Sequence, residues 1–567
     1  MSSSRPLVTR PQAGAAVLES LAGFGELYAQ LFAARGVKSA IELDYGLANL
    51  APISSLENID AAVELLLSKR DERIVVVGDF DVDGATSTAL MLRCFREFGF
   101  KDVDYRVPNR FKYGYGLTPE IVKEVAKSSP ALIITVDNGI SSLDGVEEAR
   151  SSGIAVLVTD HHLPGDQLPS ADVIVNPNLS GSRFASANLA GVGVAFYVLA
   201  ALGQALQEQG QPGAARIPAT YLDLVALGTV ADVVPLDHNN RILVEQGIRR
   251  MRAGKTVPGI SALLQQGGRQ VRRTVSSDLG FAVGPRLNAA GRLEDMSLGI
   301  ECLLTDDHDV AARHAATLDQ INKQRREIES TMRDQAFSYV ESLDPRRLPR
   351  CVCLYEASWH QGVVGLIASR VKDRCHRPVI AFAKENDGFL KGSGRSVSGV
   401  NIRDLLESIS TVRPGLIDKF GGHAMAAGLT IAESAYEEFA RLADAQLARL
   451  YPDADFSGAI LTDGPLPSDA MTLTFARDLR DAGPWGSGFP EPMWSGDFEV
   501  VEQRTVGEKH LKLRVCPVAG GTPVDAIAFN QAGPVYRGVV QLAYRLDVNE
   551  YRGVERAQLI VEQISPV

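Results

Sequence analysis

Short apolar runs alternate with segments of helical spacing between about residues 70 and 180. Segments such as STALMLRCFREFG and SSLDGVEEARSSG lie between the runs, and their apolar residues recur with the period of a helix. Strands that alternate with helices form βαβ units, and these units build a parallel sheet. The pattern therefore predicts an α/β domain with the strands RIVVVGD, VDYRVP, ALIITVD, IAVLVTD and ADVIVNP.

The patterns on either side of this domain are different. Residues 1–69 have mainly helical spacing and are predicted to form an N-terminal helical extension. The segment 307–343 contains no Gly or Pro, and its apolar residues recur at helical spacing, which predicts one long helix. The apolar positions that define this helix are Leu318, Ile321, Ile328 and Met332.

Two more folded regions are expected after the long helix. A second α/β pattern runs from about residue 350 to 445, and short alternating runs with turns predict a small β-barrel after residue 455. We therefore predict an N-terminal extension, an α/β domain, a connecting helix, a second α/β domain and a barrel. Their predicted bounds are 1–69, 70–300, 301–345, 346–450 and 455–567.

The composition is that of a cytoplasmic globular protein. With 567 residues, of which 45% are hydrophobic, the chain can form several cores. No window has the roughly 18 uninterrupted apolar residues of a membrane span, and the first residues lack the apolar run of a secretion signal. The six cysteines are scattered, and Cys351 and Cys353 lie in an apolar, strand-like run, which predicts buried thiols and no metal or redox site.

The net charge of −11 argues weakly against a nucleic-acid partner, because such proteins usually carry a basic excess. The argument is limited for two reasons. Carboxylates that are concentrated at a metal site are neutralised when the metal binds, and basic residues can still line one groove of an acidic protein.

Acidic and histidine side chains end three of the predicted strands, and a fourth apolar run, LDLVALGTVADVVPL, contains another aspartate. Because the carboxyl ends of parallel strands converge on one crevice, these side chains should meet in space. They are Asp79, Asp81 and Asp83 after the first strand, Asp137, the run Asp160, His161 and His162, and Asp232.

Carboxylate oxygens with one or two imidazoles favour Mn²⁺ or Mg²⁺ over a metal that prefers thiolates. Five or six such ligands are too many for one ion, and they suit two ions about 3.5–4 Å apart that share a carboxylate. A lone Asp after a strand is usually a helix N-cap. Coincidence is nevertheless improbable for four strand ends, and a buried Asp232 needs a partner.

Two other interpretations of GDFDVDG are less consistent with the sequence. An EF-hand calcium loop needs Glu at its twelfth position and a helix before it, but Leu90 stands there and a β-branched run precedes the loop. The segment DVDGAT also resembles the first motif of haloacid-dehalogenase-type phosphatases, in which Asp81 would be a nucleophile. That family needs a later strand-end Ser or Thr, whereas the later strands here end in VDNG and TDHH.

In this order, DFDVDG, VDNG, TDHH and GTVADVVPL resemble the four motifs of the DHH phosphoesterase superfamily. FGGHAMAAG resembles the GGH motif of its substrate domain. VPNRFKYGYGLTP, GPRLNAAGRL, WHQGVVGLIASR, KGSGRS and PWGSGFPEP are similar to segments of its bacterial, single-strand-specific 5′→3′ DNA exonucleases. The likeness runs from about residue 40 to the C-terminus. It implies an α/β protein with a parallel-sheet DHH catalytic domain, a long connecting helix, a DHHA1-type substrate domain and a C-terminal OB-fold β-barrel.

The resemblance implies that the ligands are divided between two divalent ions, Mn²⁺ or Mg²⁺. Asp79 and Asp81 would hold one ion, and Asp83, His161 and Asp232 would hold the other. Two cations would cancel the repulsion among the carboxylates, and they would convert a bound water to hydroxide near neutral pH.

The remaining catalytic roles also follow from the resemblance. Asp137 would bridge the two ions, and His162 would contact the scissile phosphate or orient its neighbour His161. Asp137, His161 and His162 are therefore the predicted catalytic residues. No covalent intermediate is needed, so no Ser or Cys nucleophile is expected at the site.

Other residues are expected to bind the nucleic acid. Arg110, Ser393 and Arg395 would form a pocket for a terminal 5′-phosphate, because Arg contacts phosphate oxygens in a bidentate manner. Tyr115 would stack on a base. Arg286 and His423 would grip backbone phosphates. In the barrel, the candidates for contacts with single-stranded DNA are Trp485, His510, Lys512, Phe529 and Tyr551, and packing in the core is an equally good interpretation of its aromatic residues.

The resemblance thus implies a two-metal 5′→3′ exonuclease that degrades single-stranded DNA to nucleoside 5′-monophosphates in DNA repair and recombination. A narrow channel between the catalytic domain and the 350–445 domain would exclude duplex. One alternative is a short-oligonucleotide or cyclic-dinucleotide phosphodiesterase of the same superfamily, although these are typically shorter and lack the barrel. Another is a non-catalytic replication scaffold that has lost its ligands. We expect a cytoplasmic, nucleoid-associated monomer without membrane contact, with single-strand-binding protein and a repair helicase as partners.

Overall fold

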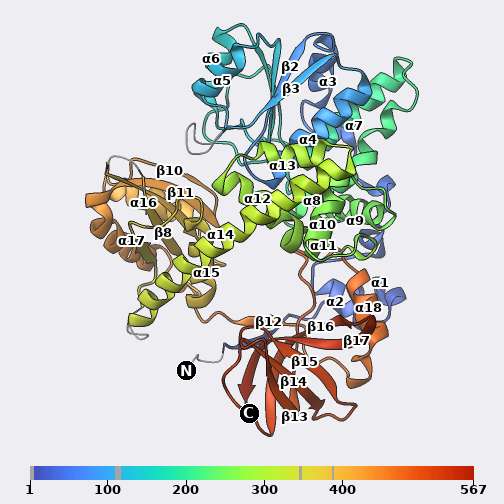
Figure 1. Ribbon diagram of the computed structural model, residues 1–567, viewed down its shortest axis with the longest axis vertical. Helices are drawn as coiled ribbons and strands as arrows, with labels where there is room; N and C mark the ends of the chain where they lie inside the picture. Colours follow the sequence, from blue (N-terminus) through green and yellow to red (C-terminus); the bar gives the residue numbers. More distant parts are fainter. Residues whose placement is uncertain (1–4, 109–115, 344–347, 386–387) are drawn as a thin grey trace. The chain divides into compact units, whose positions relative to one another are not determined.

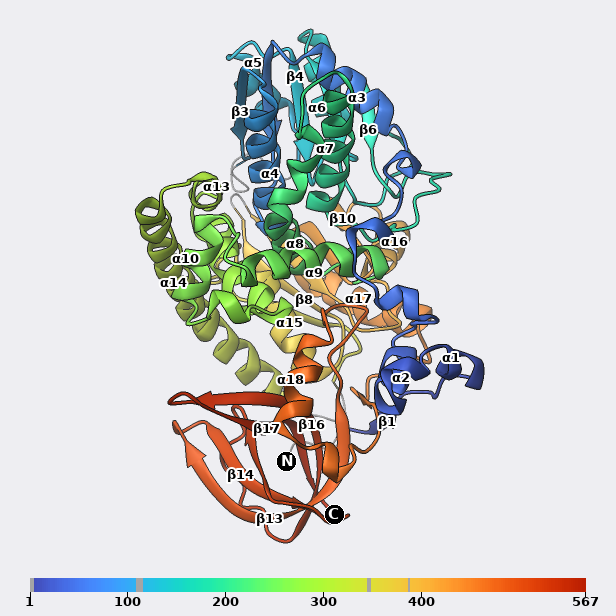
Figure 2. The same cartoon turned by 90° about the vertical axis from the view of Figure 1, so that its right-hand side faces the viewer.

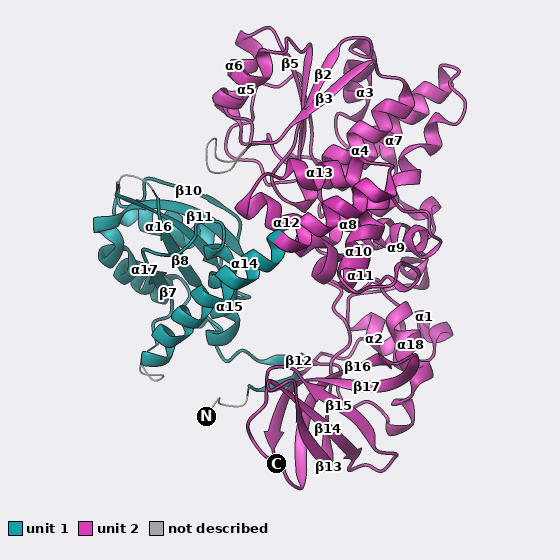
Figure 3. Ribbon diagram, viewed as in Figure 1, with its two compact units in different colours: residues 1–8, 321–460 teal, residues 9–320, 461–567 magenta. Residues whose placement is uncertain are grey.

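The computed structural model describes residues 5–108, 116–343, 348–385 and 388–567. The chain forms two compact units, which are coloured separately in Figure 3. One unit contains residues 1–8 and 321–460, and the other contains residues 9–320 and 461–567. The larger unit therefore combines the first α/β region with the C-terminal region, although they are far apart in sequence.

A five-stranded sheet organises the first α/β region, and all of its strand pairs are parallel. All five strands predicted from the apolar runs are confirmed, and their spatial order is β3-β2-β4-β5-β6. The order reverses between β2 and β4, and such a switch point is where ligands bind in open α/β sheets. The strands are β2 (Arg73–Val77), β3 (Asp102–Arg106), β4 (Leu132–Val136), β5 (Ala155–Thr159) and β6 (Val173–Val175).

Helices cover both faces of this sheet (Figure 1). Helices α4 (Val82–Phe98) and α7 (Gly191–Glu208) pack on one face, and α5 (Pro119–Ala126) and α6 (Leu143–Ser151) pack on the other. Alternate residues of the buried strands point to opposite faces, so each strand contributes to both layers. This burial on both faces explains why the strands appear in the sequence as continuous apolar runs.

The segment before β2 is mainly helical, as predicted, and contains α1 (Ala15–Ser20), α2 (Glu26–Ala33) and α3 (Ile59–Ser68). Helix α3 packs against α7, and Ile59 and Leu66 are buried in the same core as the sheet. The core is therefore continuous across residue 69. The domain boundary that we placed there stays a prediction.

The fourth apolar run is a helix and not a strand, so our strand-end placement of Asp232 was wrong. Helix α8 (Leu222–Ala231) packs against α4 and α9 (His238–Arg252), and its residues from Leu222 to Thr229 are all buried. A helix that is buried on every side shows no polar face, so its sequence is like that of a buried strand. The helices that follow are α10 (Pro258–Gln266), α11 (Ser276–Asp278), α12 (Gly284–Leu293) and α13 (Ser297–Leu304).

The long connecting helix is confirmed as α14 (His308–Ser342). After it, a second five-stranded sheet has the order β10-β11-β9-β8-β7, in which only β7 and β8 are parallel. Cys351 and Cys353 are buried at its edge, as expected. The strands are β7 (Val352–Tyr355), β8 (Val379–Lys384), β9 (Phe389–Arg395), β10 (Lys419–Gly422) and β11 (Ala426–Ala432), and the helices are α15 (Val364–Cys375), α16 (Ile402–Val412) and α17 (Tyr436–Leu450).

The C-terminal strands form a closed five-stranded barrel in the order β13-β14-β15-β17-β16, which confirms the predicted OB-type architecture. Trp494, Phe498 and Tyr544 fill its interior, and α18 (Leu473–Asp481) packs on β16 and β17 (Figure 2). In the described residues, no helix combines the length and the apolar character that crossing a membrane requires. The strands are β13 (Trp494–Val506), β14 (His510–Pro517), β15 (Val524–Ala528), β16 (Val539–Tyr551) and β17 (Val554–Pro566).

Candidate metal centre and substrate-binding residues

The three aspartates after β2 are held in different ways by the start of α4. Asp79 is buried in the loop that leaves the strand. Asp81 is the N-cap of α4, and its side chain accepts a hydrogen bond from the backbone amide of Gly84 at 3.0 Å. Asp83 lies in the first turn, which directs its carboxylate toward the N-terminus of α7. The alternating spacing therefore gives the three carboxylates three different environments.

Asp137 follows β4 on the other side of the switch point and is only 2% exposed. Its backbone φ of +60° is uncommon for a residue other than glycine, and such conformations persist where the surrounding structure enforces them. The start of α7 approaches it closely, because a Cβ on Gly191 would lie 2.7 Å from the Asp137 Cβ. Only glycine at position 191 allows this approach.

His161 and Asp232 complete the cluster. His161 Nε2 lies 3.1 Å from an Asp137 oxygen, 3.6 Å from an Asp232 oxygen and 3.9 Å from an Asp83 oxygen. Asp232 reaches the cluster from the C-terminal end of α8. The Nε2 atom of His161 is buried and makes no hydrogen bond within the part of the chain that the structure describes. Carboxylates on several sides of such a nitrogen create a place for a positive charge.

Three overlapping sets of ligand atoms lie in this cluster, and within each set the atoms are all within 4.8 Å of one another. Asp137 and His161 each belong to two of the sets, so the sets share members. The predicted division places Asp79 and Asp81 apart from Asp83 and Asp232. These two pairs fall in different sets, and their assignment to two ions stays a prediction. The sets are Asp79–Asp81–Asp137, Asp83–His161–Asp232 and Asp137–His161–His162.

The electrostatics of the cluster favour a cation. Burial, followed by repulsion from neighbouring carboxylates, raises the pKa of Asp83 and Asp137 well above the usual value, and burial also raises the pKa of Asp232. Burial lowers the pKa of His161, which leaves its imidazole neutral and able to act as a ligand. The donor set of oxygens with one imidazole therefore fits Mn²⁺ or Mg²⁺.

Asp160 holds His162 in place behind the cluster. The Nδ1 atom of His162 lies 2.7 Å from Asp160 Oδ1, and Asp160 also accepts hydrogen bonds from the backbone amides of Ile140, His161 and His162. Burial opposes ionisation of both groups, but their hydrogen bond and mutual attraction outweigh it. They raise the pKa of His162 to about 9 and lower the pKa of Asp160.

The sequence interpretation missed two asparagines that fix the backbone of Asp160, His161 and His162, which we call the DHH turn. Asn176 donates to the carbonyl of His162 at 2.9 Å, and Asn178 donates to the carbonyl of His161 at 2.6 Å. Asn176 directly follows β6, the fifth parallel strand. The strand-end rule that identified Asp137 therefore provides a signal for Asn176 too.

Ser393 and Arg395 lie near each other on β9, with Arg395 Nη1 3.1 Å from Ser393 Oγ. The start of α15 packs against both side chains, because a Cβ on Gly365 would lie 2.9 Å from each of them. A helix N-terminus carries partial positive charge, so an arginine, a hydroxyl and a helix start are grouped here. His423 lies in the same unit, in the turn between β10 and β11.

The predicted contact of Arg286 with a backbone phosphate stays a prediction, and the structure shows what the side chain binds within the chain. Its side chain is buried and forms an ion pair with Asp319. It also donates to the carbonyls of Ala282 and Gln266. The guanidinium therefore fastens α12 to its neighbours. Arg110 and Tyr115 lie outside the described residues.

The candidate residues of the barrel region fall into two classes. Trp485 precedes the barrel and packs against both Phe32 and Phe489, so packing is the better interpretation of this residue. Phe529 and Tyr551 are instead 50% and 65% exposed. His510 contacts the Phe529 ring edge to face, at 5.3 Å between centroids, and Lys512 forms an ion pair with Asp525 at 3.2 Å.

Family models match three stretches of the chain. They describe the DHH family N-terminal domain at residues 73–229, the DHHA1 domain at 349–449 and the RecJ OB domain at 462–563. A relative from Escherichia coli, the single-stranded-DNA-specific exonuclease RecJ, is 51% identical over 95% of this chain and 96% of its own length.

Two solved structures of RecJ from Thermus thermophilus are also similar. The complex with Mn²⁺ has a TM-score of 0.82 and 29% identity and covers 99% of this chain and 79% of that chain. The complex with Mg²⁺ has a TM-score of 0.76 and 27% identity, and it covers 99% of this chain and 78% of that chain. The chain therefore belongs to the RecJ family of single-stranded-DNA-specific exonucleases within the DHH superfamily.

Proposed function

We propose that this protein is an exonuclease that hydrolyses single-stranded DNA from the 5′ end, uses two divalent metal ions and releases nucleoside 5′-monophosphates. The observation that carries the proposal is the set of overlapping ligand groups in which Asp137 and His161 are shared. Two ions that share ligands stabilise both the attacking and the leaving oxygen of an in-line phosphodiester displacement. Family membership supplies the substrate class, because the relatives are named for single-stranded DNA.

Each acidic residue has a proposed place in this centre. Asp79 and Asp81 would hold one ion, and Asp83, His161 and Asp232 would hold the other, with Asp137 between them. Bound Mn²⁺ or Mg²⁺ would supply a hydroxide near neutral pH and neutralise charge on the phosphate.

The role that we propose for His162 depends on its orientation. The hydrogen bond from His162 Nδ1 to Asp160 and the fixed carbonyls of the DHH turn hold the imidazole in one place. We propose that the held imidazole contacts the scissile phosphate. A group that is already oriented loses little entropy when the substrate binds.

The 5′→3′ direction would come from a pocket that recognises the terminal phosphate. Ser393, Arg395 and the start of α15 form a grouping that suits an anion. Arg110 is also proposed to contact a terminal 5′-phosphate, and His423 is proposed to contact the backbone of the bound strand. Phe529 and Tyr551 offer exposed rings on which unpaired bases can stack.

The biological setting is also a proposal. Single-stranded DNA ends arise in repair and recombination, and we propose that the protein acts there with single-strand-binding protein and a repair helicase. The domain bounds given above, a monomeric state and association with the nucleoid belong to the same proposal.

An end-labelled substrate tests this function. Single-stranded DNA with a label at either end would be incubated with Mn²⁺, in parallel with duplex DNA and with a dinucleotide. The proposal expects mononucleotides from the 5′ end of single strands only, and no product in a chelator. Release from the 3′ end alone, or preference for the dinucleotide, would overturn it. No product at all would favour the non-catalytic scaffold.

A further inference from the structure

Two ligands of one proposed metal site, Asp83 and Asp232, are held by segments that meet in a partly buried polar cluster. The cluster lies beside the loop that joins α8 to α9, and we call it the Asp237 cluster. It contains Ser186 and Asn188 from the segment before α7, and Asp237 and Asn240 from the start of α9. None of these residues contacts the substrate in the function proposed above.

The first segment holds Asp83. The backbone amides of Gly191 and Val192 donate to the two Asp83 oxygens at 2.6 and 2.9 Å. These amides belong to the first turn of α7, and Asn188 lies only three residues before Gly191. The position of Asn188 therefore bears directly on the amides that orient the Asp83 carboxylate.

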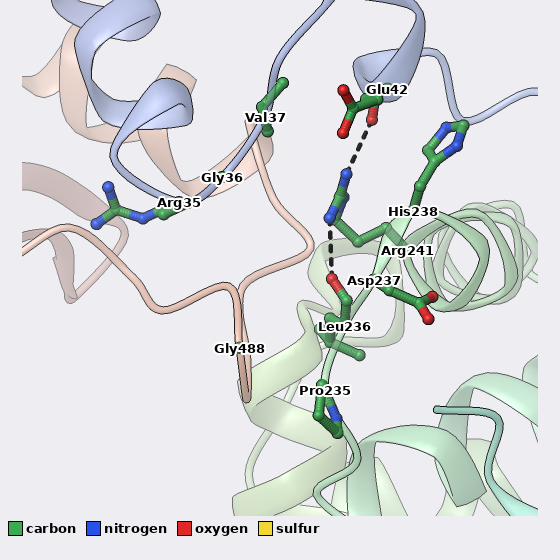
Figure 4. Close-up of a pocket in the computed structure, with 10 residues that line it drawn as sticks. All are labelled: Arg35, Gly36, Val37, Glu42, Pro235, Leu236, Asp237, His238, Arg241 and Gly488. Atoms are coloured by element: carbon green, nitrogen blue, oxygen red, sulfur yellow. Dashed lines mark hydrogen bonds between the residues drawn. The ribbon is translucent and has the colours of Figure 1, made fainter. Parts of the chain in front are cut away.

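The second segment holds Asp232. It runs from Val233 to Asp237, and Val233 has a φ of +64°, which a β-branched residue rarely adopts. Surrounding bonds must keep such a backbone in place. The Asn240 side chain donates to the Pro235 carbonyl at 2.9 Å. Figure 4 shows the bond from Arg241 to the Leu236 carbonyl, at 2.9 Å.

Direct bonds join the two segments. Asp237 accepts from the Ser186 hydroxyl at 2.7 Å and from the Asn188 side chain at 3.2 Å, while its other oxygen caps α9. The Asn240 amide also donates to the Asn188 carbonyl at 2.6 Å, so one fully buried side chain (0% exposed) binds both segments. Loss of the Asn240 side chain removes this donor from the Asn188 carbonyl and one of the two donors of the Pro235 carbonyl, which also accepts from the Asp237 amide at 2.9 Å.

The ligands of the other proposed site are held differently. Asp79 lies in the loop after β2, Asp81 caps α4, and Asp137 follows β4. Among the described residues, the bonds named above for the Asp237 cluster join the segment before α7, the α8–α9 loop and the start of α9. None of these named bonds is made to Asp79, Asp81 or Asp137. A change in the cluster should therefore affect the two sites unequally.

We propose that Asn240 and Asp237 are positioning residues that set the spacing between Asp83 and Asp232 and so govern metal affinity at the Asp83–His161–Asp232 site alone. The inference rests on the proposed two-metal function. Residues behind metal ligands commonly change metal affinity by about 10–100-fold when they are replaced.

The test is calorimetric titration of the metal-free full chain with MnCl₂. Wild type should show two binding events. Asn240→Ala should weaken one event about 10–100-fold and leave the other within about twofold. Ser186→Ala removes one bond to Asp237 and should weaken the same event by a smaller factor, and this variant keeps the inference testable if Asn240→Ala does not fold.

Asn239→Ala is the matched control. Asn239 is the adjacent buried asparagine of α9 and also makes two hydrogen bonds, from the Ala51 amide and the Tyr197 hydroxyl. Neither bond reaches the α8–α9 loop, so both Mn²⁺ events should remain near wild type. If Asn240→Ala and Ser186→Ala leave both events unchanged, or weaken both equally, the inference is wrong. If wild type itself binds no Mn²⁺, the proposed function fails first.

Discussion

Without metal, the Asp137→Asn variant should be more stable than wild type, and with metal it should be less stable than wild type. The substitution keeps the shape of the side chain and removes one negative charge from a cluster of five carboxylates, three of which are buried. Unit charges about 4 Å apart interact by about 4 kcal/mol at an effective dielectric constant of about 20. Protonation already relieves part of this repulsion, because the pKa of Asp137 is raised well above its usual value by burial and by its neighbours.

The magnitude follows from this partial relief. We expect the metal-free variant to gain about 1–2 kcal/mol, which is about 2–8 °C in melting temperature for a domain of ~150–250 residues. Mn²⁺ at about 100 times its dissociation constant should stabilise wild type by about 2.7 kcal/mol, or about 5–11 °C. The variant should lose most of the stabilisation by Mn²⁺, because Asp137 belongs to two of the ligand sets.

Thermal unfolding in chelator and in MnCl₂ measures both quantities. Asp223→Asn is the control, because Asp223 is a buried carboxylate on α8 whose partners are Thr256 and Val257. This control should lose stability in both conditions and keep the full increment from Mn²⁺. The reasoning is refuted if Asp137→Asn melts below wild type in chelator, or if Mn²⁺ stabilises the variant as much as wild type.

Three further predictions concern pH and DNA. A carboxyl group whose pKa is raised on folding contributes stability that is present near pH 3.8 and lost as pH rises through the raised value. In chelator, the excess in melting temperature of Asp137→Asn over wild type should therefore grow with pH. A difference in melting temperature that stays constant with pH would contradict this. Arg395→Ala should raise KM for 5′-phosphorylated strands about tenfold with little change in kcat, with 5′-hydroxyl strands as the control and equal KM for both proteins as the contrary result. Phe529→Ala and Tyr551→Ala should each weaken binding of single-stranded DNA by about 1–3 kcal/mol in anisotropy titrations, whereas Val518→Ala, an exposed control on the barrel, should not; affinities equal to wild type would exclude stacking on these rings.

The sequence predicted the parts of the fold that depend on local pattern. The five buried strands and α14 have clear periodicity or clear boundaries, and both were found. Helix α8 was misread because it is buried on every side, so that its apolar run has no helical face. The N-terminal boundary was hard to predict because Ile59 and Leu66 join a core formed by residues distant in sequence.

The candidate site was predictable for a similar reason. Strand-end carboxylates such as Asp79 and Asp137 converge by topology, and topology followed from the alternation of strands and helices. The ion pair of Arg286 was not predictable, because the partner of a guanidinium depends on tertiary packing, here Asp319 of α14. Asn240 gave no signal at all, because its two bonds are to backbone carbonyls, which have no sequence signature.

Anomalous scattering from crystals soaked in Mn²⁺ tests the central claim, two ions with divided ligands, most directly. The account predicts two manganese peaks, one beside Asp79 and Asp81 and the other beside Asp83, His161 and Asp232, with Asp137 in contact with both. A single peak, or two peaks with Asp81 and Asp83 bound to the same ion, would contradict it.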